Sequence, residues 1–140
     1  MFRPPFLKAA AAVQLSLVLA QSASAQDSGS VVMELNGLTD AQNDSCALTV
    51  VTTNRLAQGL QRAAWQVAIF DADGRVKALP VLDFGALTVG KNKIGIFQVP
   101  DGACNTISRI IFNDVAECTA DDGTDLRDIC LQSLETQTRS

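Results

Sequence analysis

The stretch WQVAIFDADG, residues 65–74, shows the pattern from which the fold class is predicted. Trp65, Val67 and Ile69 fall on one face of an extended chain, and this period of two is typical of a half-buried β-strand. Asp71-Ala72-Asp73-Gly74 then supplies turn residues, and Arg75–Leu82 returns the chain. The stretch therefore predicts a β-hairpin.

The same period of two dominates the chain on both sides of this hairpin, and no internal repeat is found. Cys46–Thr53 is the clearest example, because it alternates and is rich in β-branched residues. Further strands are expected at Val31–Asn36, Lys93–Val99 and Ile107–Asn113. Asn54–Ala64 is either a helical turn or a polar loop. About six short, mostly antiparallel strands predict a mainly β chain with an immunoglobulin-like β-sandwich.

The period changes near the C-terminus. From Thr124 onward, Leu126, Ile129, Cys130 and Leu134 are spaced as one apolar stripe of a short helix, with Thr124 as the N-cap. Nearby aspartates suit the positive end of the helix dipole. We expect this helix to pack against the sheets, with Cys130 on its buried side.

The four cysteines predict two disulfides, because an exported chain of this size commonly uses them as staples. If the strands alternate in direction, Cys46 and Cys104 lie at one end of the sandwich. Cys118 follows a strand that has crossed roughly 20 Å to the other end, beyond the roughly 7 Å that a disulfide spans between Cα atoms. We therefore expect Cys46 to pair with Cys104 and Cys118 with Cys130. Neither a Cys-x-x-Cys pair nor a histidine is present to support a redox or zinc site.

The N-terminus has the features of a cleavable signal helix. Met1–Ala25 combines a basic start, an apolar run from Ala9 to Ala20 and an Ala23-x-Ala25 pattern, which predicts cleavage after Ala25 by the general secretory route. The apolar run is too short to cross a bilayer as a helix. We expect a signal peptide at 1–25, a disordered tether at 26–30 and one domain at 31–140, in the periplasm.

Composition excludes several function classes. The chain has no histidine, which removes the Ser-His-Asp and Cys-His mechanisms. Removal of residues 1–25 leaves 115 residues with 9 basic and 15 acidic side chains, a net charge of −6. An acidic domain does not favour nucleic acid or an anionic membrane surface as a partner. We expect no enzyme activity, no cofactor and no stable membrane insertion after signal cleavage.

Two acidic clusters and one aromatic side chain are the other candidates for a binding site. Asp71–Gly74 resembles the start of a calcium loop but lacks the downstream glutamate and the intermediate ligand, and a hairpin turn explains it. Asp121–Asp125 has the carboxylates to hold Ca²⁺ weakly, but capping of the helix N-terminus explains the same residues. We therefore predict no metal site. Among the aromatic side chains, Trp65, Phe97 and Phe112 are expected in the core, whereas Phe84 is expected to be exposed.

Two resemblances follow from these residues. The strand ending in Phe70-Asp71, with Gly74 and the Leu87-Thr88-Val89-Gly90 turn, resembles FxLYD-type immunoglobulin-like domains, which implies an envelope sandwich. The run from Glu34 to Cys130, with Trp65 and Leu82–Leu87, looks like a group of uncharacterised exported alphaproteobacterial proteins labelled only by their signal sequence. This resemblance implies a periplasmic location and no activity.

Two function classes remain. The first is a noncatalytic periplasmic binding or protein-interaction module, whose partner we expect to be an envelope protein engaged by a sheet edge or the end loops. The second is a small-ligand or Ca²⁺-binding protein that uses the acidic turns. Ca²⁺ binding to the native state would raise the melting midpoint.

Overall fold

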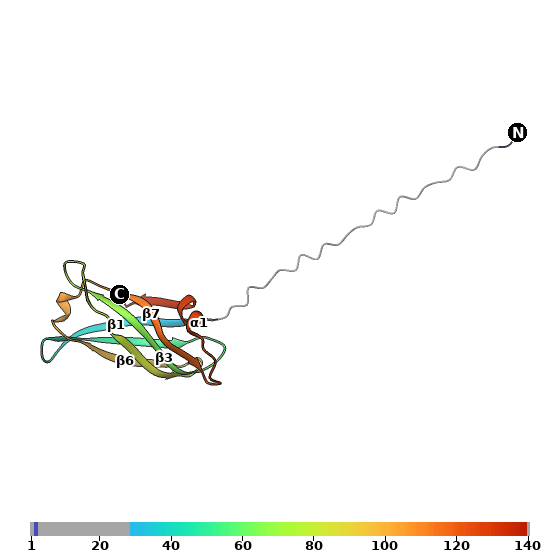
Figure 1. Cartoon of the computed structure of the whole chain (residues 1–140), viewed down its shortest axis with the longest axis horizontal. Coiled ribbons are helices and arrows are strands. Elements are labelled where there is room, and N and C mark those ends of the chain that lie inside the picture. The colour runs from blue at the N-terminus through green and yellow to red at the C-terminus, as the bar shows by residue number, and fades with distance from the viewer. Residues whose placement is uncertain (1, 3–28, 140) are drawn as a thin grey trace.

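The computed structural model describes residues 2 and 29–139. Its described part contains eight strands, a short 3₁₀ helix and one α-helix (Figure 1). In chain order these are β1 (Val31–Ala41), β2 (Ser45–Asn54), β3 (Leu60–Phe70), β4 (Val76–Ala78), β5 (Val81–Leu87), β6 (Asn92–Val99), η1 (Cys104–Thr106), β7 (Arg109–Ala120), α1 (Arg127–Gln132) and β8 (Leu134–Thr138). The predicted signal peptide at 1–25 and most of the tether at 26–30 lie outside the described residues.

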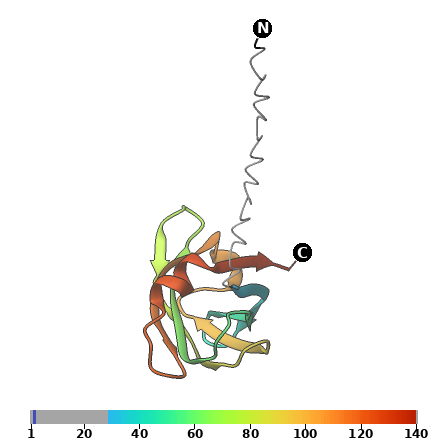
Figure 2. The ribbon, with the colours of Figure 1, turned by 90° about the vertical axis from the view of Figure 1, so that its right-hand side faces the viewer.

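The strands form two four-stranded sheets packed as a sandwich, which confirms the expected fold class (Figure 2). The first sheet has the order β6-β2-β1-β8. In the second sheet, β3 is central: β7 pairs with it from Leu60 to Phe70, and β4 and β5 pair with successive parts of β3. All strand pairs are antiparallel except β1 with β8.

The core lies between the sheets and follows the period of two. Along β2, every second residue from Cys46 to Asn54 is buried, while the intervening residues are partly exposed. Trp65 of β3 is fully buried and stands edge-on to Phe84, with ring centroids 6.0 Å apart. Phe97 and Phe112 pack against this core as partly buried side chains. The alternation in the sequence therefore identified the face of each of these strands that is removed from water.

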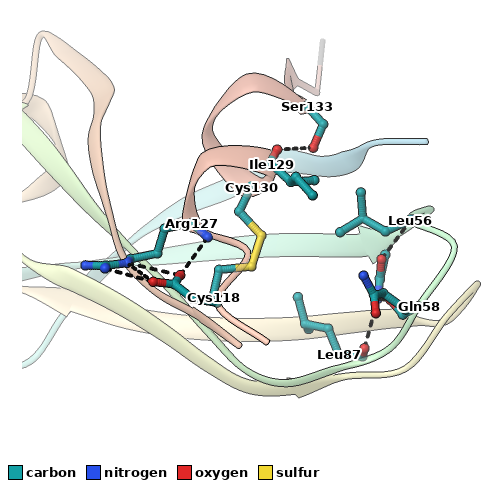
Figure 3. The surroundings of a disulfide bond; sticks show 10 residues. Leu56, Gln58, Leu87, Cys118, Arg127, Ile129, Cys130 and Ser133 are labelled. Atoms are coloured by element: carbon teal, nitrogen blue, oxygen red, sulfur yellow. Dashed lines mark hydrogen bonds and ion pairs between the residues drawn. A yellow bond between two sulfur atoms is a disulfide. The ribbon is translucent and has the colours of Figure 1, made fainter. Parts of the chain in front are cut away.

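Asn54, at the end of β2, is a buried polar residue with several hydrogen-bond partners. Its Nδ2 donates to the carbonyl oxygens of Gln58 and Leu87 at 3.1 and 3.0 Å, and its Oδ1 accepts from the Leu56 N–H at 2.9 Å. A buried amide is stable when its donors and acceptor are paired in this way. Asn54 thus joins the β2–β3 connection to the end of β5; its partners Leu56, Gln58 and Leu87 are labelled in Figure 3.

The C-terminal helix is shorter than predicted. It spans Arg127–Gln132, its N-cap is Leu126, and no side chain caps it, so the prediction of Thr124 as N-cap was wrong. Leu134, expected on the helical stripe, instead begins β8. The Val31 N–H donates to the Ser133 carbonyl at 3.1 Å, and β8 then pairs in parallel with β1. Backbone pairing with the distant β1 overrode the local spacing, which resembled a helix.

Several strand boundaries also differ from the prediction. Leu60–Ala64, expected in a turn or loop, belongs to β3, because its residues pair with both β5 and β7. The returning strand Arg75–Leu82 is divided between β4 and β5 on either side of Leu79-Pro80. Pro80 cannot donate a backbone hydrogen bond, which favours a break at this point. The strand expected at Ile107–Asn113 continues to Ala120, and the strand expected at Val31–Asn36 continues to Ala41.

Candidate functional site

The four cysteines form the predicted pairs. Cys46 at the start of β2 is bonded to Cys104 in η1, with Cα atoms 4.8 Å apart. Cys118 near the end of β7 is bonded to Cys130 in α1, with Cα atoms 6.5 Å apart (Figure 3). Cys46, Cys118 and Cys130 are fully buried. The two bonds connect segments at opposite ends of β7, as the argument from strand direction requires, and two disulfides indicate an oxidising environment outside the cytoplasm.

The first acidic turn is held by its own backbone. Asp71 Oδ1 accepts the N–H groups of Asp73 and Arg75 at 2.9 and 3.0 Å, and Gly74 takes a positive φ of 78°. This is an Asx-type turn, in which the carboxylate replaces a backbone acceptor. The hairpin predicted at Asp71–Gly74 is confirmed. Backbone N–H groups of the turn already pair with one carboxylate oxygen of Asp71, so no bound ligand is needed to explain the position of that oxygen.

The second acidic cluster also caps backbone groups. Asp122 accepts the Thr124 N–H at 2.9 Å. Asp125 accepts the Arg127 N–H at 3.0 Å and forms an ion pair with the Arg127 guanidinium at 2.8 Å. The Arg127 side chain, followed by its N–H, lowers the pKa of Asp125. Across the described residues, no group of three or more histidine, cysteine or acidic side chains is placed to hold a metal ion.

Phe84 does not form the exposed aromatic site that the sequence suggested, so that expectation was wrong. It is 4% exposed and lies edge-on to Phe97, with centroids 5.2 Å apart. The returning strand was expected to end at Leu82, but β5 continues to Leu87 and so includes Phe84. Leu82, Phe84 and Leu87 are all buried. Phe84 thereby joins the two sheets along their β5–β6 side.

The exposed edge strand β6 is a candidate binding surface that the site predictions missed. Ile94 and Ile96 are 66% and 68% exposed on its outward face. They pair in register with Val51 and Thr49 of β2 on that face. The signal was present in Lys93–Val99, where apolar residues occupy both faces of the predicted strand, but the sequence alone does not show that this strand lies at an edge.

The β6 edge is more regular than the other edges in the described sheets. Its ladder with β2 runs from Asn92 to Val99 without a register shift. By contrast, β7 contains register shifts, and β8 has five residues. Irregular and short edges resist the addition of a further strand. Lys93 lies at the start of β6, where its Nζ donates to the Ala86 carbonyl at 3.0 Å.

Charged side chains cross the outer face of the second sheet. Arg62 of β3 contacts Asp83 of β5 at 2.8 Å and Glu117 of β7 at 3.2 Å. At the far end of β3, the Arg109 guanidinium lies 4.2 Å from the centre of the Phe70 ring. These partly exposed contacts connect β3 to β5 and β7. Arg62 and Arg109 each have a partner on the sheet.

Comparisons with known proteins show the fold alone. No protein-family model matches the chain, and no curated protein matches it in sequence. Among solved structures, the chain is similar to IrmA from Escherichia coli, with a TM-score of 0.58 over 78% of this chain and 92% of that chain. The sequences are 10% identical, so the likeness supports the β-sandwich and carries no activity with it.

The described residues contain no helix long and apolar enough to span a bilayer.

Proposed function

We propose that the chain is a noncatalytic binding module of the bacterial periplasm, which takes an extended segment of an envelope protein onto the β6 edge. The observation that carries the proposal is the uninterrupted β6 ladder with Ile94 and Ile96 exposed on its outward face. An added strand would pair with the free backbone groups of β6, and its alternate side chains would cover the isoleucines.

The proposed location of the protein and the proposed class of its partner are supported by different observations. The two disulfides agree with an oxidising compartment, and the predicted signal peptide and the resemblance to exported alphaproteobacterial proteins favour the periplasm among such compartments. The acidic charge favours a protein partner over nucleic acid. The alternative of a Ca²⁺ or small-ligand site at the acidic turns stays a prediction, for which the turn geometry offers no added support.

Photo-crosslinking in intact cells tests the proposal. A photoreactive amino acid at position 96 should form a defined adduct with one envelope protein, and Ile94→Lys should abolish this adduct, because a charge on the edge opposes strand addition. Leu79→Lys is the matched control: Leu79 is 51% exposed but lies between β4 and β5, so this change should leave the adduct intact.

Backbone pairing is the second measurement. In the complex with the identified partner, the amides of β6 that point away from β2 should become protected from hydrogen exchange, while the amides of β7 should not change. Equal loss of the adduct in Ile94→Lys and Leu79→Lys would contradict the proposal. An adduct with a second copy of the chain would also contradict it, because the occupant would then be the protein itself.

A further inference from the structure

The two long sides of the sandwich are closed to different degrees. On one side, the Phe84–Phe97 contact and the hydrogen bond from Lys93 to Ala86 join β5 to β6. On the other side, β7 and β8 form the edges of the two sheets, and among the described residues no hydrogen bond, ion pair or ring contact joins these two strands. Residues of both strands line a cavity together with core side chains, so the interior of the sandwich is reached between β7 and β8.

A cavity of about 370 Å³ opens on this side. Its floor consists of apolar side chains from both sheets that are at most 4% exposed: Met33, Leu48, Val50, Val67 and Leu82. The cavity lies within the size range of small-molecule sites, roughly 300–1,000 Å³. It is not formed by the acidic turns or by the β6 edge, so it is independent of the surface in the proposed function.

The lining restricts the chemistry of a ligand. None of the twelve lining residues carries a charge. The β7 wall contributes Ile110 and Phe112, which pair with the buried Ile69 and Val67 and so lie on the inward face. A buried charged group would have no counter-charge here, and desolvation would oppose its entry. A neutral polar group would find no hydrogen-bonding side chain on the apolar floor either, so we expect the part of a ligand that enters the cavity to be hydrocarbon.

The mouth has a different character. Thr136 and Thr138 of β8 are in register with Met33 and Leu35 of β1, which places them on the inward face at the rim. Both residues are exposed, and no hydrogen bond to either hydroxyl is found among the described residues. They can therefore donate to or accept from a polar group that stays at the surface while an apolar chain lies inside.

From the volume, the uncharged lining and the hydroxyls at the mouth, we infer that the cavity binds one medium-length acyl chain, with its polar head group beside Thr136 and Thr138. At about 30 Å³ for a water-sized group, the cavity holds on the order of a dozen such groups, comparable to a single chain of about 8 to 12 carbons. Burial of the chain against the apolar floor supplies the driving force.

Binding of decanoate below its micellar concentration tests this inference. Isothermal titration of the purified mature protein should show one saturable site, and the melting midpoint should rise with decanoate. Butyrate should bind far more weakly, because it buries fewer methylene groups. Contacts between the decanoate chain and the methyl groups of Met33 and Val67, observed by NMR, should locate the site.

Matched tryptophan variants distinguish decanoate binding in the cavity from decanoate binding on the outer surface. Thr136→Trp places a large ring at the mouth and should weaken decanoate binding at least about tenfold. Glu135→Trp adds the same ring one residue earlier, on the outward face of β8, and should leave binding unchanged. Thr138→Trp is a second blocking variant in case Thr136→Trp unfolds. The native near-ultraviolet circular dichroism spectrum checks that each variant is folded.

Two results would overturn the inference. The first is the absence of saturable decanoate binding to the folded protein. The second is unchanged binding in folded blocking variants, which would place decanoate elsewhere. Neither result bears on the β6 edge, because Ile94 and Ile96 do not line this cavity.

Discussion

At the scale of single residues, two buried polar side chains on the inward face of β2 differ in their hydrogen bonding. Asn54 is fully buried with its amide bonded to Leu56, Gln58 and Leu87. Thr52, two positions earlier on the same face of β2, is also fully buried, but its Oγ1 has no hydrogen-bond partner within the described part of the chain. A buried hydroxyl that loses water without gaining a partner destabilises the folded state.

We predict that Thr52→Val stabilises the protein by about 1 kcal/mol, because it replaces the unpaired hydroxyl with a methyl group of similar size. Urea unfolding followed by tryptophan fluorescence measures the change, since Trp65 is the single tryptophan and is buried. Thr49→Val, on the outward face of β2, is the control and should change the stability by less than about 0.5 kcal/mol. Destabilisation by Thr52→Val would mean that the hydroxyl has a partner in solution.

At the scale of strands, Arg62 connects β3 to both of its neighbours on the outer face. The Gly85 N–H and then the Arg62 guanidinium hold the pKa of Asp83 below its ordinary value of 3.8. Because the folded-state pKa is lowered, the contribution of Asp83 to stability is present above that ordinary value. It is lost as the pH falls through the folded-state pKa.

We predict that Arg62→Gln raises the pKa of Asp83, although it stays below 3.8 because the Gly85 N–H still donates to the carboxylate. An NMR titration of the side-chain carboxyl carbons measures this pKa. Arg109→Gln, on the same face of the sheet but stacked on Phe70, is the control and should not alter it. No change in Arg62→Gln would show that the ion pair is absent in solution.

At the scale of the whole molecule, the two disulfides close loops of very different length. Cys46 and Cys104 are 58 residues apart, and Cys118 and Cys130 are 12 apart. In the loop-entropy model, the longer loop stabilises the folded state by about 4 kcal/mol and the shorter by about 3 kcal/mol, because each bond limits the unfolded chain.

We therefore predict that the double variant Cys46→Ala and Cys104→Ala loses about 1 kcal/mol more stability than Cys118→Ala and Cys130→Ala. Urea unfolding of the two double variants measures the difference, and a peptide map of the unreduced wild type checks the pairing. The reverse order of stability would show that local packing of α1 on β7, and not loop length, sets the contribution of these bonds.

The fold class, the inward faces of β2 and β3 and the disulfide pairs could be predicted from the sequence. These features depend on local alternation and on the direction in which consecutive strands run. Cys46–Thr53 and the hairpin at Asp71–Gly74 needed no distant information, because the side-chain period and the turn residues are local properties. Strand direction then placed Cys104 and Cys118 at opposite ends of one strand.

Three features are found only in the folded molecule: which strands lie at edges, where the helix ends and where the sandwich opens. Leu134 fits a helical stripe, but its backbone pairs with Val31, about a hundred positions earlier in the chain. Phe84 lies on a short strand whose burial depends on Phe97 of the other sheet. The β6 edge and the cavity between β7 and β8 also depend on contacts between residues that are far apart in the sequence. The free energy of backbone pairing and of burial against distant residues outweighs weak local preferences, and sequence periodicity carries no record of those partners.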